Sequence, residues 1–212
     1  MKADRRLLLY LCSFYVLLFL GILSFYLFNP FRNECIRGDC KNGKGVYVSG
    51  SGIKYEGEWK NGKRHGKGTL TSPDGSKYVG EWRNNRFHGH GVKTSPVHRA
   101  YKYIGEWKNG NKDGEGIHYF SQRDWYKGQW KNGKMEGYGV YVIRSIRKHE
   151  GQFKNGRLHG YGILTDKDGT QHKGEWVNGK KHGEGTLIYP DGTKLKGKWI
   201  DDKLAEKENE IN

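Results

Sequence analysis

The sequence predicts an all-β protein, an elongated single-layer antiparallel β-meander that is preceded by one transmembrane α-helix. Three observations lead to this fold class. A segment of about 14 residues recurs from residue 55 onward, mostly at intervals of 23 residues. Its copies alternate aromatic and charged side chains and contain Asn-Gly turns, a pattern typical of short strands joined by tight turns. Residues 7–28, by contrast, form one uncharged apolar run.

Composition favours a repeat protein. Only 34% of the 212 residues are hydrophobic, but 14% are aromatic and 33 are glycine. A low apolar content alone would suggest disorder, whereas disordered chains contain few aromatic residues. A fold that buries large rings in thin layers between neighbouring repeats satisfies both observations.

The apolar run at 7–28 is long enough to cross a membrane. At about 1.5 Å per residue its helix would measure about 33 Å, against a hydrocarbon core of about 30 Å. A cleaved secretory signal has a shorter apolar region followed by small residues, whereas this run ends in Tyr26, Leu27 and Phe28. We therefore expect an uncleaved signal anchor and a single-pass membrane protein.

The flanking charges bear on the orientation of this anchor. The leader at 1–6 carries three basic residues, which favours a cytoplasmic leader, although Arg32 and Arg37 beyond the run favour the opposite. Because long domains cross largely regardless of charge, we expect the repeat domain to be extracytoplasmic.

Two cysteines lie in the expected juxtamembrane linker at 29–40. Cys35 and Cys40 are separated by four residues and are the only cysteines outside the apolar run. No further cysteine or histidine follows them at the spacing of a zinc site. A disulfide between them would fit an oxidising compartment.

The repeat array fills almost all of the remaining chain. A half copy at 42–52 precedes the full copies, so that the expected repeat domain spans 41–204 and is followed by an acidic tail at 205–212. The copies begin at Tyr55, Tyr78, Tyr103, Tyr126, His149 and His172, and a broken copy begins at Leu195.

Each copy is expected to contain two strands and two turns. Residues 55–60 alternate as a strand does, and Asn61-Gly62 is a turn dipeptide because both residues tolerate positive φ. Residues 66–71 form the returning strand and 72–75 form the second turn. Since neighbouring strands lie about 4.8 Å apart, each repeat advances the ribbon by about 10 Å.

The glycines are expected to make room for the tryptophans. A single-layer sheet has no second layer to cover large rings, so each Trp must lie across its neighbouring strands. In the first full copy Gly57, Gly66 and Gly68 would form the slots and Trp59 would fill them. The residues equivalent to Trp59 are Trp82, Trp107, Trp130, Phe153, Trp176 and Trp199.

The pattern Y-x-G-x-W-x-x-G-x-x-x-G-x-G with a downstream D-G resembles the MORN (membrane occupation and recognition nexus) repeat. The resemblance covers the array and departs from the pattern at Asn85, His149, His172 and an insertion around 95–100. It implies an elongated β-meander found in proteins that organise membranes or assemblies, sometimes beside enzymatic domains such as lipid kinases or methyltransferases. We expect no such domain in this sequence, in which only residues 205–212 follow the array.

The sequence predicts no metal, cofactor or catalytic site. Equivalent residues of adjacent repeats lie about 10 Å apart, whereas zinc ligands lie about 2 Å from one ion. A role in the turns therefore fits the histidines that recur before glycine better than metal binding does. The pair Gly66 and Gly68 lacks the helix of a phosphate-binding loop. We thus expect no enzyme. The recurring histidines are His65, His88, His159 and His182.

Basic residues recur in or beside the first turn of each repeat. Along one edge of a meander they could contact an anionic surface, each contributing about 1 kcal/mol near a charged membrane. The alternative is a solvated rim that discourages edge pairing. These candidate contact residues are Lys60, Lys63, Arg64, Arg83, Arg86, Lys108, Lys112, Lys131, Lys134, Lys154, Arg157, Lys180 and Lys181.

These observations predict a non-catalytic, membrane-anchored scaffold or binding module. It would use its MORN-repeat ribbon to contact a protein partner or an anionic phospholipid surface. The alternative is an accessory module of an enzyme complex, or a small hydrolase whose site the sequence does not show. Nucleic-acid binding ranks third, because the aromatic residues are in phase with the packing face of the strands.

Overall fold

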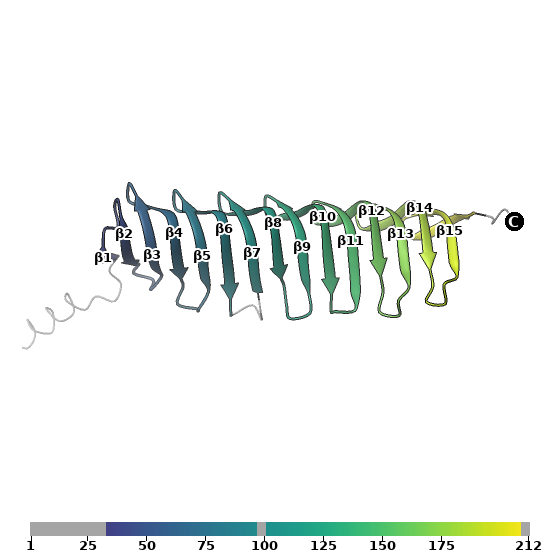
Figure 1. The fold of residues 1–212 in the computed structure, drawn as a ribbon, viewed down its shortest axis with the longest axis horizontal. Helices are drawn as coiled ribbons and strands as arrows, with labels where there is room; N and C mark the ends of the chain where they lie inside the picture. Colours follow the sequence, from purple (N-terminus) through teal and green to yellow (C-terminus); the bar gives the residue numbers. More distant parts are fainter. Residues whose placement is uncertain (1–32, 97–100, 209–212) are drawn as a thin grey trace, which may run out of the picture.

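The computed structural model describes residues 33–96 and 101–208, which form a single antiparallel sheet of 16 strands. The strands lie side by side in sequence order from β1 to β16, so that each pairs only with its neighbours in the chain. The result is an elongated ribbon one layer thick (Figure 1). The expected all-β meander is therefore confirmed.

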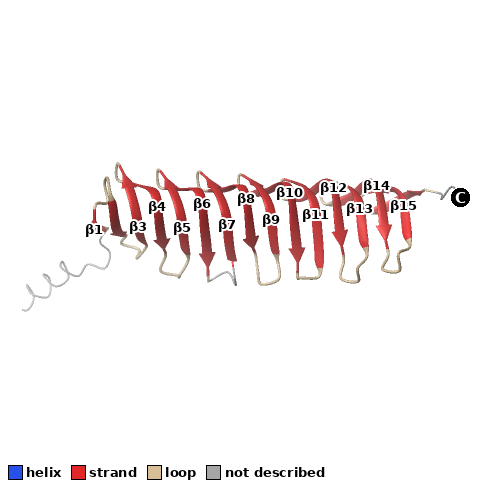
Figure 2. Ribbon diagram, in the orientation of Figure 1, coloured by secondary structure: helices blue, strands red, loops and turns tan. Residues whose placement is uncertain are grey.

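The described residues consist of strands and the turns between them (Figure 2). The first eight strands are β1 Glu34–Gly38, β2 Lys44–Val48, β3 Lys54–Lys60, β4 Lys63–Thr71, β5 Lys77–Arg83, β6 Arg86–Ser95, β7 Tyr101–Lys108 and β8 Asn111–Tyr119. The remaining strands are β9 Trp125–Lys131, β10 Lys134–Ile143, β11 Arg147–Lys154, β12 Arg157–Thr165, β13 Gln171–Val177, β14 Lys180–Ile188, β15 Lys194–Ile200 and β16 Lys203–Lys207.

The first turn of each repeat has the expected left-handed backbone. Asn61 has a φ of 51° and Gly62 a φ of 66°, which connects β3 to β4 through a two-residue loop. At Asn85, where the glycine is missing, the asparagine takes the same conformation with a φ of 67°. Asn is one of the few residues with a side chain that adopts this conformation at modest cost.

A β-bulge lies at or just after the recurring strand glycine of each of these hairpins. Between Gly57 and Glu58 the pairing of β3 with β4 shifts in register, and the same shift recurs in the equivalent hairpins up to β15 and β16. Gly66 lies in the bulge with a φ of +57°. Its role is thus to allow this backbone conformation, and it is not the slot for a tryptophan that the sequence predicted.

In the four copies that begin with tyrosine, the tyrosine ring lies directly on two paired glycines, which we call the glycine floor. A methyl group added to Gly68 would lie 2.6 Å from Cζ of Tyr55, and one added to Gly57 would lie 2.6 Å from the Tyr55 hydroxyl oxygen. Real Cβ atoms do not approach other atoms so closely, so both positions require glycine. The slot occupant is therefore Tyr55, which corrects the prediction that Trp59 fills it.

The tryptophans do lie across adjacent strands, as predicted. The indole nitrogen of Trp82 on β5 donates a hydrogen bond of 3.1 Å to the carbonyl oxygen of Gly68 on β4. The same bond links Trp59 to Gly45, Trp107 to Gly91, Trp130 to Gly116, Trp176 to Gly162 and Trp199 to Gly185.

The ends of the sheet differ from the expected boundaries at 41 and 204. Strand β1 lies within the segment predicted as the linker 29–40 and pairs with β2, while β16 extends into the predicted tail. The expected membrane anchor at 7–28 lies outside the described residues. Within 33–96 and 101–208 no helix has the length and hydropathy needed to span a bilayer.

Candidate binding site

The two faces of the ribbon have different chemistry. On β3, Tyr55, Gly57 and Trp59 point to one side, which we call the aromatic face, while Glu56 and Lys60 point to the other, the outer face. This division follows from the alternation of side chains along a strand. Because the strands pair in a constant pattern from repeat to repeat, each face carries rows of equivalent residues along the whole ribbon.

Tyrosine and tryptophan alternate along the aromatic face. Tyr55 lies between Trp59 of its own repeat and Trp82 of the next, with ring centroids 5.0 and 5.2 Å apart and the rings nearly perpendicular. Edge-to-face aromatic pairs of this kind contribute about 0.5–1.5 kcal/mol each beyond their buried area. The Tyr55 hydroxyl also donates a hydrogen bond of 3.0 Å to the carbonyl oxygen of Glu58. These contacts join each repeat to its neighbour.

The structure places three of the thirteen predicted contact residues on this aromatic face. Arg64 lies 4.6 Å above the ring of Trp82, Lys112 lies 4.3 Å above Trp130, and Lys181 lies 4.8 Å above Trp199. Each follows directly after the outer-face residue of its turn and is opposite the tryptophan in the hairpin register. They stabilise the ring stack by cation–π contact, which is worth about 0.5–2 kcal/mol.

The amine of Lys112 is largely surrounded by rings. Its Nζ lies 2.9 Å from Nδ1 of His118 and also lies over Tyr101 and Tyr103. Burial, with a smaller contribution from Lys93, lowers the pKa of Lys112 from 10.5 to about 8. Burial and the neighbouring Lys112 lower the pKa of His118 to about 3.

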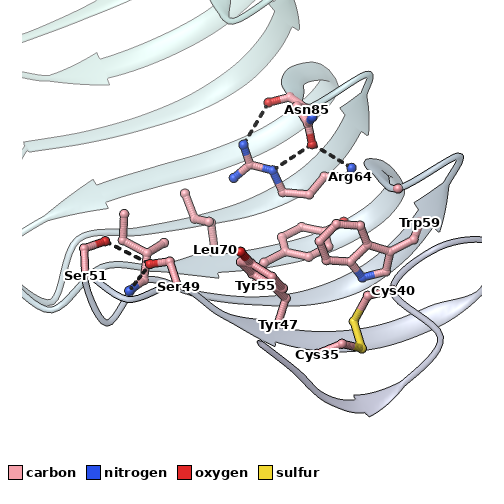
Figure 3. A pocket seen from close by; sticks show the side chains of 12 residues that line it. Cys35, Cys40, Tyr47, Ser49, Ser51, Tyr55, Trp59, Arg64, Leu70 and Asn85 are labelled. Atoms are coloured by element: carbon pink, nitrogen blue, oxygen red, sulfur yellow. Dashed lines mark hydrogen bonds between the residues drawn. A yellow bond between two sulfur atoms is a disulfide. The ribbon is translucent and has the colours of Figure 1, made fainter. Parts of the chain in front are cut away.

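A groove opens on the aromatic face at the N-terminal end of the ribbon (Figure 3). Its floor contains Tyr47, Tyr55, Trp59 and Leu70. The hydroxyls of Ser49 and Ser51 hydrogen bond to each other at one end of it, 2.8 Å apart. The groove combines apolar rings with a few polar groups, which is the usual composition of a binding pocket.

Arg64 closes one side of the groove through Asn85 of the next repeat. Its Nε donates to the Asn85 side-chain oxygen at 3.3 Å, and a terminal guanidinium nitrogen donates to the Asn85 carbonyl oxygen at 3.2 Å (Figure 3). The backbone N–H of Arg64 also donates to the same side-chain oxygen at 2.8 Å. Burial lowers the pKa of Arg64, but the neighbouring Tyr55 opposes that effect.

A disulfide borders the same groove. Cys35 on β1 is bonded to Cys40 in the turn before β2, and both residues line the groove (Figure 3). The bond closes the terminal hairpin of the sheet, in which β1 has a neighbour on one side only.

The other ten predicted contact residues lie together on the outer face, beside the Asn-Gly turns. We call this row the basic edge. All ten are exposed, and four like-charged pairs lie directly opposite each other across their hairpins: Lys60 with Lys63, Arg83 with Arg86, Lys131 with Lys134, and Lys154 with Arg157. Lys108 and Lys180 complete the edge.

Few acceptors neutralise the basic edge. Lys180 lies 3.4 Å from Asp201, and Lys134 donates to Asn155 at 3.4 Å. Within residues 33–96 and 101–208 the other eight side chains form no ion pair and donate no hydrogen bond. Like charges directly opposite on paired strands are destabilising, so these residues do not serve the stability of the sheet.

Two groups of histidines occupy defined positions of the repeat. Those that recur before glycine lie at the bulge, and across the described part of the chain no three potential ligand side chains come together as a metal site. His172 instead occupies the slot of the missing tyrosine, between Trp176 and Trp199. Burial, with a contribution from Lys181, lowers its pKa from 6.5 to about 4. His149, the leading residue of the other copy that lacks the tyrosine, has its pKa lowered to about 4, again chiefly by burial.

The sequence did not reveal the groove, the Arg64–Asn85 contact or the position of the three aromatic-face cations. The sequence did contain one indication that the three cations lie on the aromatic face. The positions equivalent to Arg64, Lys112 and Lys181 hold Phe87, Met135, Leu158 and Leu204 in the other repeats. A repeat position that holds a long cation in some copies and an apolar residue in others is typical of a side chain that lies against a hydrophobic surface.

This fold and its two surfaces define an elongated repeat protein in which consecutive hairpins form one continuous meander. The chain belongs to the MORN repeat family, whose model matches it over residues 39–54, 55–77, 78–97, 103–124, 126–145, 149–171 and 172–194. A search of curated proteins found no match. The array is consistent with a non-catalytic binding or scaffold module.

Proposed function

We propose that this chain is a non-catalytic binding module that is anchored in a membrane by residues 7–28 and contacts an anionic surface through its basic edge. The observation on which the proposal rests is the set of eight edge cations that form no ion pair and donate no side-chain hydrogen bond within the described residues. Four like-charged pairs persist although each is unfavourable for the sheet. Binding to anionic groups would compensate this cost.

The geometry of the edge suits a large surface better than a small ligand. The pairs recur at intervals of about 10 Å, because two strands separate equivalent residues. A row of this kind can follow a continuous array of negative charge such as anionic phospholipid headgroups. Each basic residue close to such a surface contributes about 1 kcal/mol, and this attraction weakens as salt screens it.

The orientation of the module remains as the sequence predicts it, with the leader in the cytoplasm and the sheet outside. The Cys35–Cys40 disulfide supports this orientation, because disulfides persist in oxidising compartments. Protease treatment of intact cells tests it: the sheet should be digested from outside, and its full protection would contradict the proposed side.

Capture of vesicles tests the basic edge. Full-length protein reconstituted in neutral vesicles should bind a second, fluorescent population that contains anionic phospholipid, and should not bind a neutral population. The quadruple variant K131E/K134E/K154E/R157E reverses two adjacent pairs of the edge. If each residue contributes about 1 kcal/mol, capture should weaken by about three orders of magnitude at low salt.

The outer face offers a matched control. Reversal of Lys127, Lys148, Lys173 and Lys194 changes the net charge by the same amount but leaves the basic edge intact. This variant should retain capture. Equal loss in both variants would mean that only net charge matters, and capture by unaltered protein that does not respond to salt would also contradict the proposal.

A protein partner at the N-terminal groove is the second candidate. The groove offers exposed ring edges, two hydroxyls and the Arg64 guanidinium within one surface depression (Figure 3). A partner bound there should be released by a substitution such as Leu70→Arg, which fills the groove, while the vesicle capture described above is unchanged.

A further inference from the structure

One row of the outer face departs from its own repeat pattern. The second residue of each copy, directly after the leading aromatic position, is charged in five copies: Glu56, Lys127, Glu150, Lys173 and Lys196. In the two adjacent copies that begin at Tyr78 and Tyr103 this residue is instead Val79 or Ile104. Both are partly exposed, at 44% and 37%.

Val79 and Ile104 join two apolar residues of neighbouring strands to form one continuous apolar patch. In the strand register Val79 on β5 is opposite Val92 on β6, Val92 is opposite Ile104 on β7, and Ile104 is opposite Ile117 on β8. We call these four residues the outer patch. Elsewhere in the row each apolar residue has charged neighbours: Ile163, for example, lies between Glu150 and Lys173. The outer patch is therefore confined to four neighbouring strands.

Opposite charges flank the outer patch along the strand direction. On the side of the basic edge lie Glu81 and Glu106, two residues beyond Val79 and Ile104 on the same strands. On the other side, two residues before them, lie Lys77 and Lys102, both exposed. Since residues two apart on a strand share a face, the patch lies between an acidic row and a basic row.

This arrangement is complementary to itself. Rotation by 180° about an axis parallel to the length of the ribbon superposes the outer patches of two copies face to face. The same rotation places the acidic row of each copy opposite the basic row of the other. A two-fold axis along the strands would instead oppose like charges. Isologous contacts with two-fold symmetry are the commonest in homo-oligomers.

We propose that the outer patch is a self-association surface on which a second copy of this chain packs, outer face to outer face, with the two ribbons stacked and parallel along their length. The contact buries Val79, Val92, Ile104 and Ile117 against their counterparts, and Lys77 and Lys102 pair with Glu81 and Glu106 of the second copy. This inference does not depend on the proposed function, because the basic edge lies beside the turns, outside the patch.

The mass of the full-length protein in detergent micelles, measured by light scattering across a hundredfold range of concentration, tests the proposal. The unaltered chain should change from monomer to dimer. The double variant V79E/I104K restores the charged residue types that the other copies carry at this position, so the fold should tolerate it. It should raise the dissociation constant of the dimer at least tenfold, with an unchanged circular dichroism spectrum and melting temperature.

Charge reversal of the lysines beside the outer patch provides a second test of the dimer. K77E/K102E should also weaken the dimer, about fivefold or more, whereas K173E/K194E changes the same number of outer-face lysines on β13 and β15, away from the patch, and should leave the equilibrium unchanged. A chain that stays monomeric throughout the range overturns the proposal. So does a dimer that persists unchanged in V79E/I104K, because it would form through another surface.

Discussion

Substitution of Gly68 tests how the tyrosine ring is held on the sheet. In Gly68→Ala the new methyl group would lie 2.6 Å from Cζ and 2.7 Å from Cε2 of Tyr55. These atoms belong to a rigid, fully buried ring and cannot turn away as the end of a flexible side chain could. The ring must therefore shift, together with Trp59 and Trp82, which pack on its two sides.

The cost can be built from the contacts that the shift disturbs. Overpacking of a well-packed core costs about 1–3 kcal/mol. Weakening of two edge-to-face ring pairs, worth about 0.5–1.5 kcal/mol each, and of the hydrogen bond from Tyr55 to Glu58, worth about 0.5–1.5 kcal/mol, adds to it. Because these effects overlap, we expect Gly68→Ala to lower the free energy of unfolding by roughly 2–4 kcal/mol.

The chain contains its own control for this substitution. Gly162 is the equivalent glycine in the copy whose leading tyrosine is replaced by His149. A methyl group there would lie 3.3 Å from the Glu150 carbonyl oxygen and 3.4 Å from Cδ1 of Trp176. Since these are nearly ordinary contacts, Gly162→Ala should cost less than about 1 kcal/mol, and the gain in strand propensity over glycine offsets part of this.

Thermal unfolding of both variants tests whether Gly68 is required because of the tyrosine ring above it. At about 2–4 °C per kcal/mol for a chain of this size, the melting temperature should fall by roughly 4–16 °C for Gly68→Ala. It should fall by only a few degrees for Gly162→Ala. Equal shifts in the two variants would refute the reasoning, because they would show that the glycines matter for the backbone alone and not for the ring above them.

Further predictions concern buried titratable groups and the disulfide. His172 has a pKa of about 4 in the folded chain and an ordinary value of 6.5, so the unfolded state binds more protons between these values and stability should fall as pH drops from 6.5 to 4. His172→Tyr should show a smaller fall in melting temperature over this range, and an unchanged fall would contradict the assignment. For Lys112, with a pKa of about 8 against 10.5, stability should rise between pH 8 and 10.5; the gain should be smaller in Lys112→Met, as urea titrations at both pH values would show. Reduction of the Cys35–Cys40 bond should increase hydrogen exchange in β1 and β2 while leaving β8 unchanged, and uniform loss of protection would argue against a local role.

Much of the fold could be predicted because its determinants are local. Asn61 and Gly62 specify a tight turn through their tolerance of positive φ, and the alternation at 55–60 specifies a strand with one aromatic face. Repetition of both along the chain then requires successive hairpins, and short connections leave only neighbouring strands to pair. The meander follows from these features without any knowledge of distant contacts.

The end strands of the sheet could not be predicted from local sequence in the same way. Residues 34–38 carry no repeat motif, and they form β1 because β2 offers them an unpaired edge, assisted by the Cys35–Cys40 bond. Strand formation there depends on a neighbour and not on the propensity of the segment.

The division of the basic residues also required the structure. Lys63 and Arg64 are adjacent in the sequence and equally basic, so composition and spacing treat them alike. The hairpin register pairs Lys63 with Lys60 on the outer face and Arg64 with Trp59 on the aromatic face. One residue therefore belongs to the basic edge, and the other packs over rings and hydrogen bonds to Asn85.

The sequence by itself thus determined the repeat, its turns, its strands and the presence of an excess of positive charge. Only the tertiary structure decided which ring occupies each glycine floor, which cations stay free, and that Val79, Val92, Ile104 and Ile117 form one patch. The physical reason is that turns depend on the φ preferences of one or two residues, whereas faces, slots and patches depend on the register between strands. Register brings together side chains from different strands and repeats, and no single segment of the sequence contains that information.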